Sequence, residues 1–142
     1  METSKDVKYW NDRYKKGGHS GYGSKGDLLK WKAEIINKYI DIFNPESIIE
    51  LGCGDGNLGS LINGNYVGYD ISREALKISK SKKLGVREEL PAEPYDLALS
   101  IDVIHHITDK KDLQEHLKYL KKHKNFIIYA PVVFENPAPH RS

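Results

Sequence analysis

Three closely spaced glycines follow an acidic residue in the first half of the sequence. Glu50 is followed by Gly52, Gly54 and Gly56. Glycines let the backbone turn tightly and approach a ligand closely, in conformations that a Cβ atom would forbid. A dinucleotide-binding turn needs G-x-G-x-x-G, but position 57 is Asn, and a carboxylate on Glu50 does not favour a pyrophosphate. The turn therefore favours a cationic ligand, with an NAD-type binding domain as the weaker alternative.

A second carboxylate stands at a spacing that suits a nucleoside ligand. Asp70 comes twenty residues after Glu50, at the end of another apolar run. An acidic residue at this spacing, at the mouth of the neighbouring strand, can accept hydrogen bonds from both ribose hydroxyls. We therefore expect Asp70 to bind a ribose.

The apolar run 95–101 is followed by three side chains that could take part in proton transfer or substrate binding. They are those of Asp102, His105 and His106. An imidazole titrates near pH ~6.5 and can take a proton from an attacking oxygen or nitrogen. The alternative is that one histidine is a pocket wall and the other a surface residue. Asp102 could contact cofactor or substrate, or it could cap a helix. We take these three residues as the catalytic candidates.

Apolar periodicity predicts strands that alternate with helices, which is typical of βαβ units and of a parallel sheet covered on both faces. Ligands of such α/β sheets bind at the carboxyl ends of the strands. The strands are expected at 47–51, 65–69, 86–88, 95–101 and 125–130, and the helices at 28–43, 56–62, 72–82 and 109–123.

Two segments carry more specific expectations. The helix at 28–43 should begin at an Asp27 N-cap and end at Asn44, with Trp31 and Tyr39 on its core-facing stripe. Before it, residues 4–27 combine aromatic residues with glycines. This composition predicts an aromatic anchor followed by a mobile, glycine-hinged loop, so residues 1–27 are interpreted as a flap over the site.

The segments 50–56 (ELGCGDG), 68–72 (GYDIS) and 95–106 (YDLALSIDVIHH) resemble three motifs of the class I S-adenosylmethionine-dependent methyltransferases. The resemblance extends over residues 46–130. It implies a three-layer Rossmann-like sandwich with strand order 3-2-1-4-5. It also implies methyl transfer from S-adenosylmethionine to an acceptor, which leaves S-adenosylhomocysteine.

The same resemblance implies roles for individual residues. The three glycines would wrap the methionine half of the cofactor, Asp70 would hold its ribose and Ile71 would pack on the adenine. Glu88 would lie near the adenine amine, and Tyr14 belongs to an aromatic lead-in that folds over the cofactor. Cofactor-binding candidates are Glu50, Gly52, Cys53, Gly54, Gly56, Asp70, Ile71, Glu88, Ser100, Ile101 and Tyr14.

The family fold continues beyond its fifth strand with a helix and an antiparallel strand pair, whereas only residues 131–142 follow here. The segment 28–142 is therefore expected to be a core truncated at its C-terminus. Its last strand would keep an apolar edge, which stable proteins usually pair or cover. A homodimer, a partner chain or a longer protein would each cover it. The alternative function is a non-catalytic cofactor-binding module or a partner subunit.

Composition limits the remaining possibilities. The 142 residues suit one domain, and a net charge of +2 indicates neither nucleic acid nor a membrane surface. A single cysteine and the absence of an apolar run of ~20 residues favour a reduced, cytoplasmic setting. His116, His123 and His140 lack the spacing of metal ligands, so no metal is expected. A small-molecule acceptor is favoured over RNA because no basic face is evident.

Overall fold

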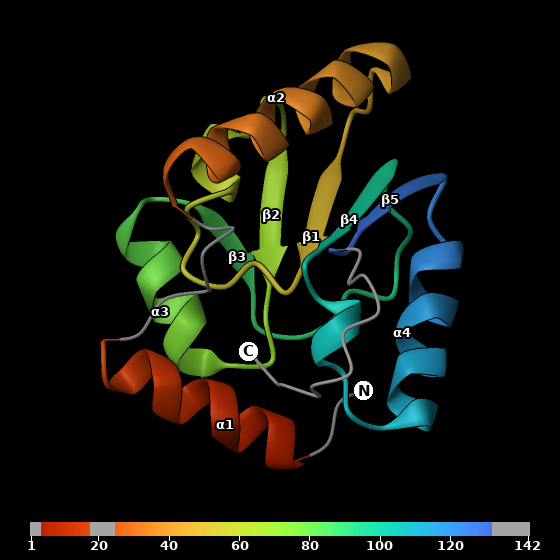
Figure 1. Ribbon diagram of the computed structural model, residues 1–142. Coiled ribbons are helices and arrows are strands. Elements are labelled where there is room, and N and C mark those ends of the chain that lie inside the picture. The colour runs from red at the N-terminus through yellow and green to blue at the C-terminus, as the bar shows by residue number, and fades with distance from the viewer. Residues whose placement is uncertain (1–3, 18–24, 132–142) are drawn as a thin grey trace, which may run out of the picture.

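The structure, a computed structural model, describes residues 4–17 and 25–131. Within them five parallel strands form a sheet in the order β3-β2-β1-β4-β5 (Figure 1), which confirms the expected α/β fold and strand order. The strands are β1 (Ile48–Leu51), β2 (Tyr66–Tyr69), β3 (Gly85–Arg87), β4 (Leu97–Ile101) and β5 (Asn125–Tyr129). The helices are α1 (Ser4–Lys15), α2 (Gly26–Phe43), α3 (Arg73–Ser81) and α4 (Lys110–Lys121), with 3-10 turns η2 (Gly59–Leu61) and η3 (Ile104–His106).

Side chains along β4 alternate between two apolar cores. Leu97 and Leu99 pack with Ile36 and other residues of α2 on one face, whereas Ala98 packs with Leu120 of α4 on the other. Successive residues of a strand point to opposite faces. The helices α2 and α4 therefore cover opposite faces of the sheet and give the fold its three layers.

Three helix ends follow from local sequence. Ser72 Oγ accepts a hydrogen bond from the Ala75 N–H at the start of α3, and Asp109 caps α4 in the same way. Asn44 ends α2 in the left-handed conformation, with φ 47°. The expected Asp27 cap is wrong, because α2 begins at Gly26, two residues earlier than expected, and Lys25 stands at the N-cap without a side-chain hydrogen bond. The helix expected at 56–62 is reduced to the short turn η2.

The first half of the N-terminal segment 4–27, which the sequence predicted as an aromatic anchor without a secondary structure, forms the helix α1. In Figure 1 this helix lies beyond the end of the sheet toward which β2 points. Asn11 Oδ1 accepts a hydrogen bond of 2.6 Å from Ser72 Oγ, and the buried Tyr14 is 5% exposed. The glycine-rich residues 18–24, to which the mobile part of the flap was assigned, lie outside the described residues.

The outer side of α2 gives a second correction. Trp31 and Tyr39 were expected in the core, but they are 48% and 46% exposed. Within the described residues the sheet ends at β5. The Trp31 ring lies beside this edge strand, with its centroid 6.3 Å from that of Tyr129. Tyr39 stacks on Phe43 of its own helix at 6.1 Å. No helix in the described part of the chain has the length and apolar character needed to cross a membrane.

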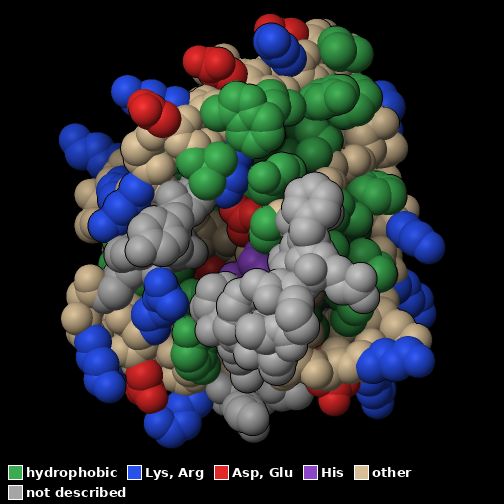
Figure 2. Space-filling model, in the orientation of Figure 1, with side chains coloured by type: hydrophobic (Ala, Val, Ile, Leu, Met, Phe, Trp, Pro, Cys, Tyr) green, Lys and Arg blue, Asp and Glu red, His purple; other side chains and the backbone are tan. Residues whose placement is uncertain are grey.

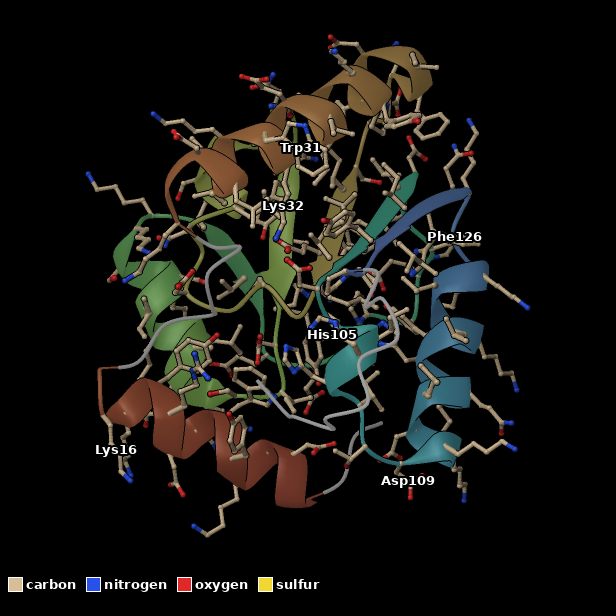
Figure 3. The ribbon with its side chains drawn as sticks, viewed as in Figure 1. Lys16, Trp31, Lys32, His105, Asp109 and Phe126 are labelled. Carbon is tan, nitrogen blue, oxygen red and sulfur yellow. The ribbon has the colours of Figure 1, made fainter. Side chains whose placement is uncertain are left out.

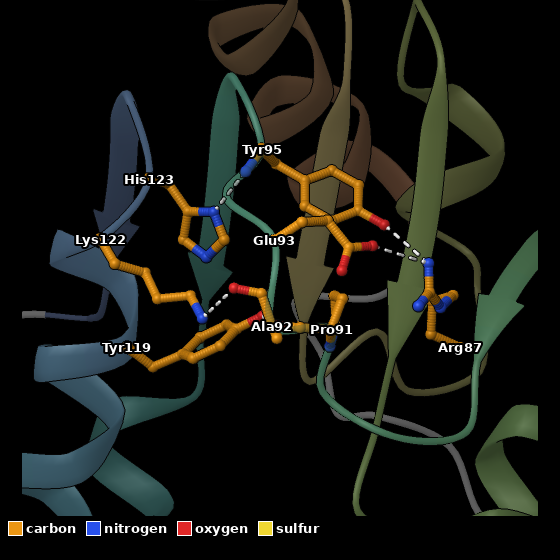
Figure 4. Close-up of polar contacts among 8 residues, drawn as sticks. All are labelled: Arg87, Pro91, Ala92, Glu93, Tyr95, Tyr119, Lys122 and His123. Atoms are coloured by element: carbon orange, nitrogen blue, oxygen red, sulfur yellow. Dashed lines mark hydrogen bonds and ion pairs between the residues drawn. The ribbon is translucent and has the colours of Figure 1, made fainter.

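The long connection from β3 to β4 is fastened to α4 by polar contacts (Figure 4). Tyr119 Oη donates to the Pro91 carbonyl at 2.7 Å, and His123 Nδ1 accepts the Tyr95 N–H at 2.8 Å. His123 Nε2 is buried without a hydrogen-bond partner among the described residues. Since Nδ1 is the acceptor, Nε2 carries the proton of the neutral ring. Burial, with a smaller effect of Lys122, lowers the pKa of His123 and so favours that neutral form.

We expect Tyr119→Phe to lower the free energy of unfolding by about 1 kcal/mol, because it removes only the hydroxyl that binds Pro91. Phenylalanine keeps the ring on which the Lys122 ammonium lies, 4.5 Å from its centroid. Urea unfolding followed by circular dichroism measures the difference. Gln114→Ala, an exposed change on the same helix, is the control. Equal stability of wild type and Tyr119→Phe would show that the contact does not fasten the connection.

Candidate functional site

A pocket opens at the carboxyl ends of β1, β2 and β4. Figure 2 looks onto it, with acidic and histidine side chains at its floor. Nine of the predicted site residues line it: Tyr14, Glu50, Gly52, Cys53, Asp70, Ile71, Ile101, Asp102 and His106. Five others are not part of its wall: Gly54, Gly56, Glu88, Ser100 and His105.

The glycine turn after β1 is required by space as well as by backbone conformation. Gly52 has φ +76°, and a Cβ atom on it would come within 2.5 Å of the Val103 side chain. Gly56 has φ +80°, and a Cβ atom there would come within 2.9 Å of Leu84. Any other residue would strain the backbone and collide with a neighbour. These glycines therefore bring the turn close to the pocket and to α3.

Asp70 is fixed in the pocket by backbone donors. Its Oδ2 accepts the Gly54 N–H and its Oδ1 accepts the Ser72 N–H, both at 2.9 Å. Burial raises the pKa of Asp70 to about 6, although these two donors act to lower it. A carboxylate offers about four acceptor positions, so each oxygen can still accept a bond from a ligand.

Glu50 is held in a different state. Its side chain is 2% exposed, and the Tyr66 hydroxyl donates to Oε1 at 2.5 Å. Burial, with the nearby carboxylates of Asp70, Asp55 and Asp102 adding to it, raises the pKa of Glu50 to about 8. Without a nearby cation, this carboxyl is mostly protonated at neutral pH.

An ion pair that the sequence analysis missed joins two walls of the pocket. Lys32 of α2 is 5% exposed, and its ammonium binds the carboxylate of Asp102. Asp102 adopts the left-handed region with φ 60°, which is uncommon for a residue other than glycine. Lys32 could have been found in the sequence, because it shares the four-residue spacing of the buried Ile36 and Ile40.

The two histidines of η3 differ in position. His106 lines the pocket, with its ring centroid 5.3 Å from Trp10 and 4.0 Å from His105. His105 is more exposed and lies beside the wall (Figure 3). Its pKa is lowered by burial and by Lys32, while Asp102 acts to raise it. His105 is therefore neutral at physiological pH and can accept a proton.

Three of the predicted cofactor residues, Ser100, Cys53 and Glu88, also have contacts with other residues of the protein. Ser100 is fully buried and hydrogen bonded at 2.8 Å to His116 Nε2. His116 itself reaches the pocket wall, which the sequence did not indicate. The Cys53 thiol lies 3.8 Å from Ser79 Oγ, and burial raises its pKa, which disfavours a reactive thiolate. Glu88 is exposed and lies 3.9 Å from the Lys80 ammonium in an ion pair.

These features define a class of protein. A parallel sheet in the order 3-2-1-4-5, a glycine turn after its first strand and a fixed carboxylate after its second are typical of Rossmann-like nucleoside-binding domains. Residues 49–124, more than half of the chain, match the family described as a methyltransferase domain. The chain therefore belongs to this methyltransferase family.

Known proteins agree with this assignment. The uncharacterized protein MJ1252 of Methanocaldococcus jannaschii is 32% identical over 110 residues, covering 72% of this chain and 43% of that protein. Malonyl-[acyl-carrier protein] O-methyltransferase 2 of Ilyobacter polytropus is 28% identical over 145 residues, covering 88% and 54%. The chain thus spans about half the length of these relatives. The magnesium protoporphyrin IX methyltransferase of Synechocystis, solved with bound S-adenosylmethionine, shares the fold, with a TM-score of 0.64, 16% identity and coverage of 88% and 74%.

Because Glu50 is protonated in the folded protein, we predict that it makes the free energy of unfolding fall as pH rises. Its pKa is about 8 in the folded protein against 4.5 for a free side chain, so between these values only the folded state keeps the proton. Glu50 should therefore contribute a loss of up to about 1.4 kcal/mol of unfolding free energy per pH unit. Asp70 contributes in the same direction only up to about pH 6, whereas the lowered pKa values of His105, His116 and His123 make stability rise with pH near their unfolded pKa of ~6.5. The difference in slope between the wild type and a Glu50 variant, from about pH 6.5 to 8, isolates Glu50.

Glu50→Gln should remove this contribution over the interval, because glutamine is neutral and can still accept the Tyr66 hydroxyl. Urea unfolding at several pH values gives the slope for each variant. Glu34→Gln, on the exposed side of α2, should retain the wild-type slope. Equal slopes in the wild type and Glu50→Gln would contradict a protonated Glu50.

Proposed function

We propose that this chain binds S-adenosylmethionine and transfers its methyl group to a small-molecule acceptor. The observation that carries the proposal is the buried Asp70 carboxylate, held by two backbone N–H groups at the mouth of an acidic pocket. The family assignment supports the same reaction class.

The pocket residues fit the chemical groups of this cofactor. The acceptor positions left on Asp70 suit a ribose diol, and the neighbouring Ile71 offers an apolar surface for an adenine. Asp55 and Asp102 also line the pocket, and Glu50 beside them is protonated without a cation but can ionise when one binds. Such an acidic wall favours a sulfonium and an ammonium over a phosphate. We propose that α1 belongs to the same domain as the sheet, because its Tyr14 contributes to the wall of the pocket.

When bound, S-adenosylmethionine supplies a methyl group to the acceptor's lone pair, while the electrons of the broken carbon–sulfur bond stay on sulfur. The chain's own contribution is mainly positioning, which can dominate an in-line transfer. Asp70 holds the ribose end, and the Lys32–Asp102 ion pair fixes the wall after β4. The neutral His105, next to His106, can accept the acceptor's proton.

A small or carrier-bound acceptor is favoured over nucleic acid. The described pocket wall contains several carboxylates and one lysine, and that lysine is already bound to Asp102. Such a wall does not favour a polyanion. Two of the similar proteins are named as a malonyl-[acyl-carrier protein] O-methyltransferase and a magnesium protoporphyrin IX methyltransferase. A non-catalytic module, the other function considered from the sequence, gains no support from these similarities.

Asp70→Asn should weaken the binding of S-adenosylmethionine and S-adenosylhomocysteine by about tenfold or more, since a hydrogen bond to a charged group contributes ~1.5–3 kcal/mol. Asparagine keeps one of the two acceptor oxygens and places an NH2 donor where the other accepted a backbone N–H, so circular dichroism must show that the variant is folded. Calorimetric titration of both ligands, with NAD as a ligand expected not to bind, measures the change. The exposed Asp41→Asn is the control. Unchanged affinity in Asp70→Asn would refute the proposed ribose site.

The pH dependence of binding tests the same carboxylate independently. With a pKa of about 6 for Asp70, the ionised acceptor is present above this pH and is lost below it. Affinity for S-adenosylhomocysteine should fall toward tenfold per pH unit below about pH 6. Circular dichroism at each pH confirms that the chain stays folded. Constant affinity from about pH 5 to 7 would contradict the requirement for an ionised Asp70.

A further inference from the structure

The phenol of Tyr66 lies in a slot that two glycines leave open. A Cβ atom on Gly59 of η2 would come within 2.6 Å of the Tyr66 hydroxyl oxygen, and one on Gly68 of β2 would come within 3.1 Å of it. Gly68 stands beside Glu50 in the register of β1 and β2. Side chains at these two glycine positions would therefore displace the hydroxyl, which donates to Glu50 Oε1 at 2.5 Å.

Tyr66 acts on the pocket through Glu50. Glu50 lines the pocket, whereas Tyr66 is not among the described residues of its wall. Burial, with the negative charge of Glu50 adding to it, raises the pKa of Tyr66 well above its ordinary value, so the hydroxyl keeps its proton and is the donor. A hydrogen bond to an ionised acceptor is stronger than one to a neutral acceptor. The hydroxyl therefore stabilises the carboxylate form of Glu50 more than the carboxylic acid form.

The other surroundings of Glu50 disfavour its ionisation. Its side chain is 2% exposed. Burial raises the pKa of Glu50 most, the Tyr66 hydrogen bond acts to lower it, and three nearby carboxylates raise it further. These carboxylates belong to the turn after β1 and to the ends of β2 and β4, and they are those of Asp55, Asp70 and Asp102.

The helices place few compensating charges at this wall. The Lys32 ammonium of α2 is bound to Asp102. The titratable groups of the wall that come from η3 and α4 are His106 and His116, and burial lowers the pKa of His116 to about 4, so this imidazole is neutral. The Cys53 thiol is also neutral, because burial raises its pKa. A cationic ligand would therefore change the electrostatic surroundings of Glu50 strongly.

We propose that Tyr66 is a positioning residue for the cofactor, because its hydroxyl prepares Glu50 to release a proton when a sulfonium- and ammonium-bearing ligand binds. The inference rests on the proposed function, since S-adenosylmethionine is the cation that drives the ionisation. In this step the O–H bond of the Glu50 carboxyl breaks, the proton passes to solvent and the electron pair stays on the carboxylate. The empty pocket thus avoids an uncompensated buried charge, and the occupied pocket gains a charge pair.

The proton released on binding can be counted by calorimetry. The full chain is titrated with S-adenosylmethionine at about pH 7 in phosphate and in Tris, which have different ionisation enthalpies, and the difference in heat gives the number of protons. Glu50→Gln, which has no proton to release, should give about one proton fewer than the wild type. Asp70 and the ligand's own amino group are present in both titrations, so their contributions cancel in this difference.

Tyr66→Phe tests the positioning role, because it keeps the ring in the slot and removes only the hydroxyl. It should weaken the binding of S-adenosylmethionine about fivefold or more at pH ~7. At about pH 8, where the wild-type Glu50 is half ionised, the variant should release up to about half a proton more, since its Glu50 keeps the proton to higher pH. A purely structural role would change the affinity without changing this count. Tyr39→Phe, on the exposed side of α2, should match the wild type in both.

The outcomes distinguish this inference from the proposed function. Saturable binding with equal proton counts in the wild type and Glu50→Gln, or with an unchanged count in a folded Tyr66→Phe, would overturn the inference and leave the proposed function intact. No binding to the wild type would refute both. Circular dichroism identifies the folded variants, and the comparison with Glu50→Gln decides the proton release even where Tyr66→Phe does not fold.

Discussion

The Asp70 carboxylate is the contact on which the pocket depends. It accepts one N–H from the glycine turn after β1 and one from Ser72 at the start of α3. Ser72 in turn caps α3 and binds Asn11 of α1, while Ser79 of α3 donates to the Gly54 carbonyl at 3.1 Å. One side chain thus joins β1, β2, α3 and, through Ser72, α1. Because these bonds use only part of its acceptor capacity, the same group that organises the pocket can also bind a ligand.

The arrangement has an energetic cost. Glu50 and Asp70 are buried close to other carboxylates, and burial raises the pKa of both above the ordinary value. Buried acidic groups destabilise the folded state unless they are hydrogen bonded or meet a cation. Tyr66 supplies part of that compensation to Glu50, and Lys32 supplies it to Asp102. A cationic ligand would relieve the remaining cost, which is a physical reason for so acidic a pocket in a family that uses a sulfonium cofactor.

Local patterns in the sequence determined what could be predicted. The strand order was implied by motif resemblance and is confirmed by the sheet. The spacing of Glu50 and Asp70 placed them at the ends of neighbouring strands, and both line one pocket. The errors concern contacts between distant segments. Trp31 falls on the apolar stripe but is exposed, because no described strand lies beyond β5. The aromatic anchor before the glycines was predicted without a secondary structure, and it forms the helix α1. His116 reaches the pocket through the packing of α4 on the sheet, which no local pattern reveals.

Helix α2 links the pocket to the open edge of the sheet. Its inward side buries Ile36 and Ile40 in the core and directs Lys32 to Asp102 at the end of β4. Its outward side carries Trp31 and Tyr39 over β5. Lys32 also lies 5.3 Å from the ring centroid of Tyr129, the last residue of β5. Whatever covers the β5 edge therefore packs on the same helix that fixes Asp102 in the pocket. Burial of that edge would add contacts to the helix that supplies Lys32 to the pocket.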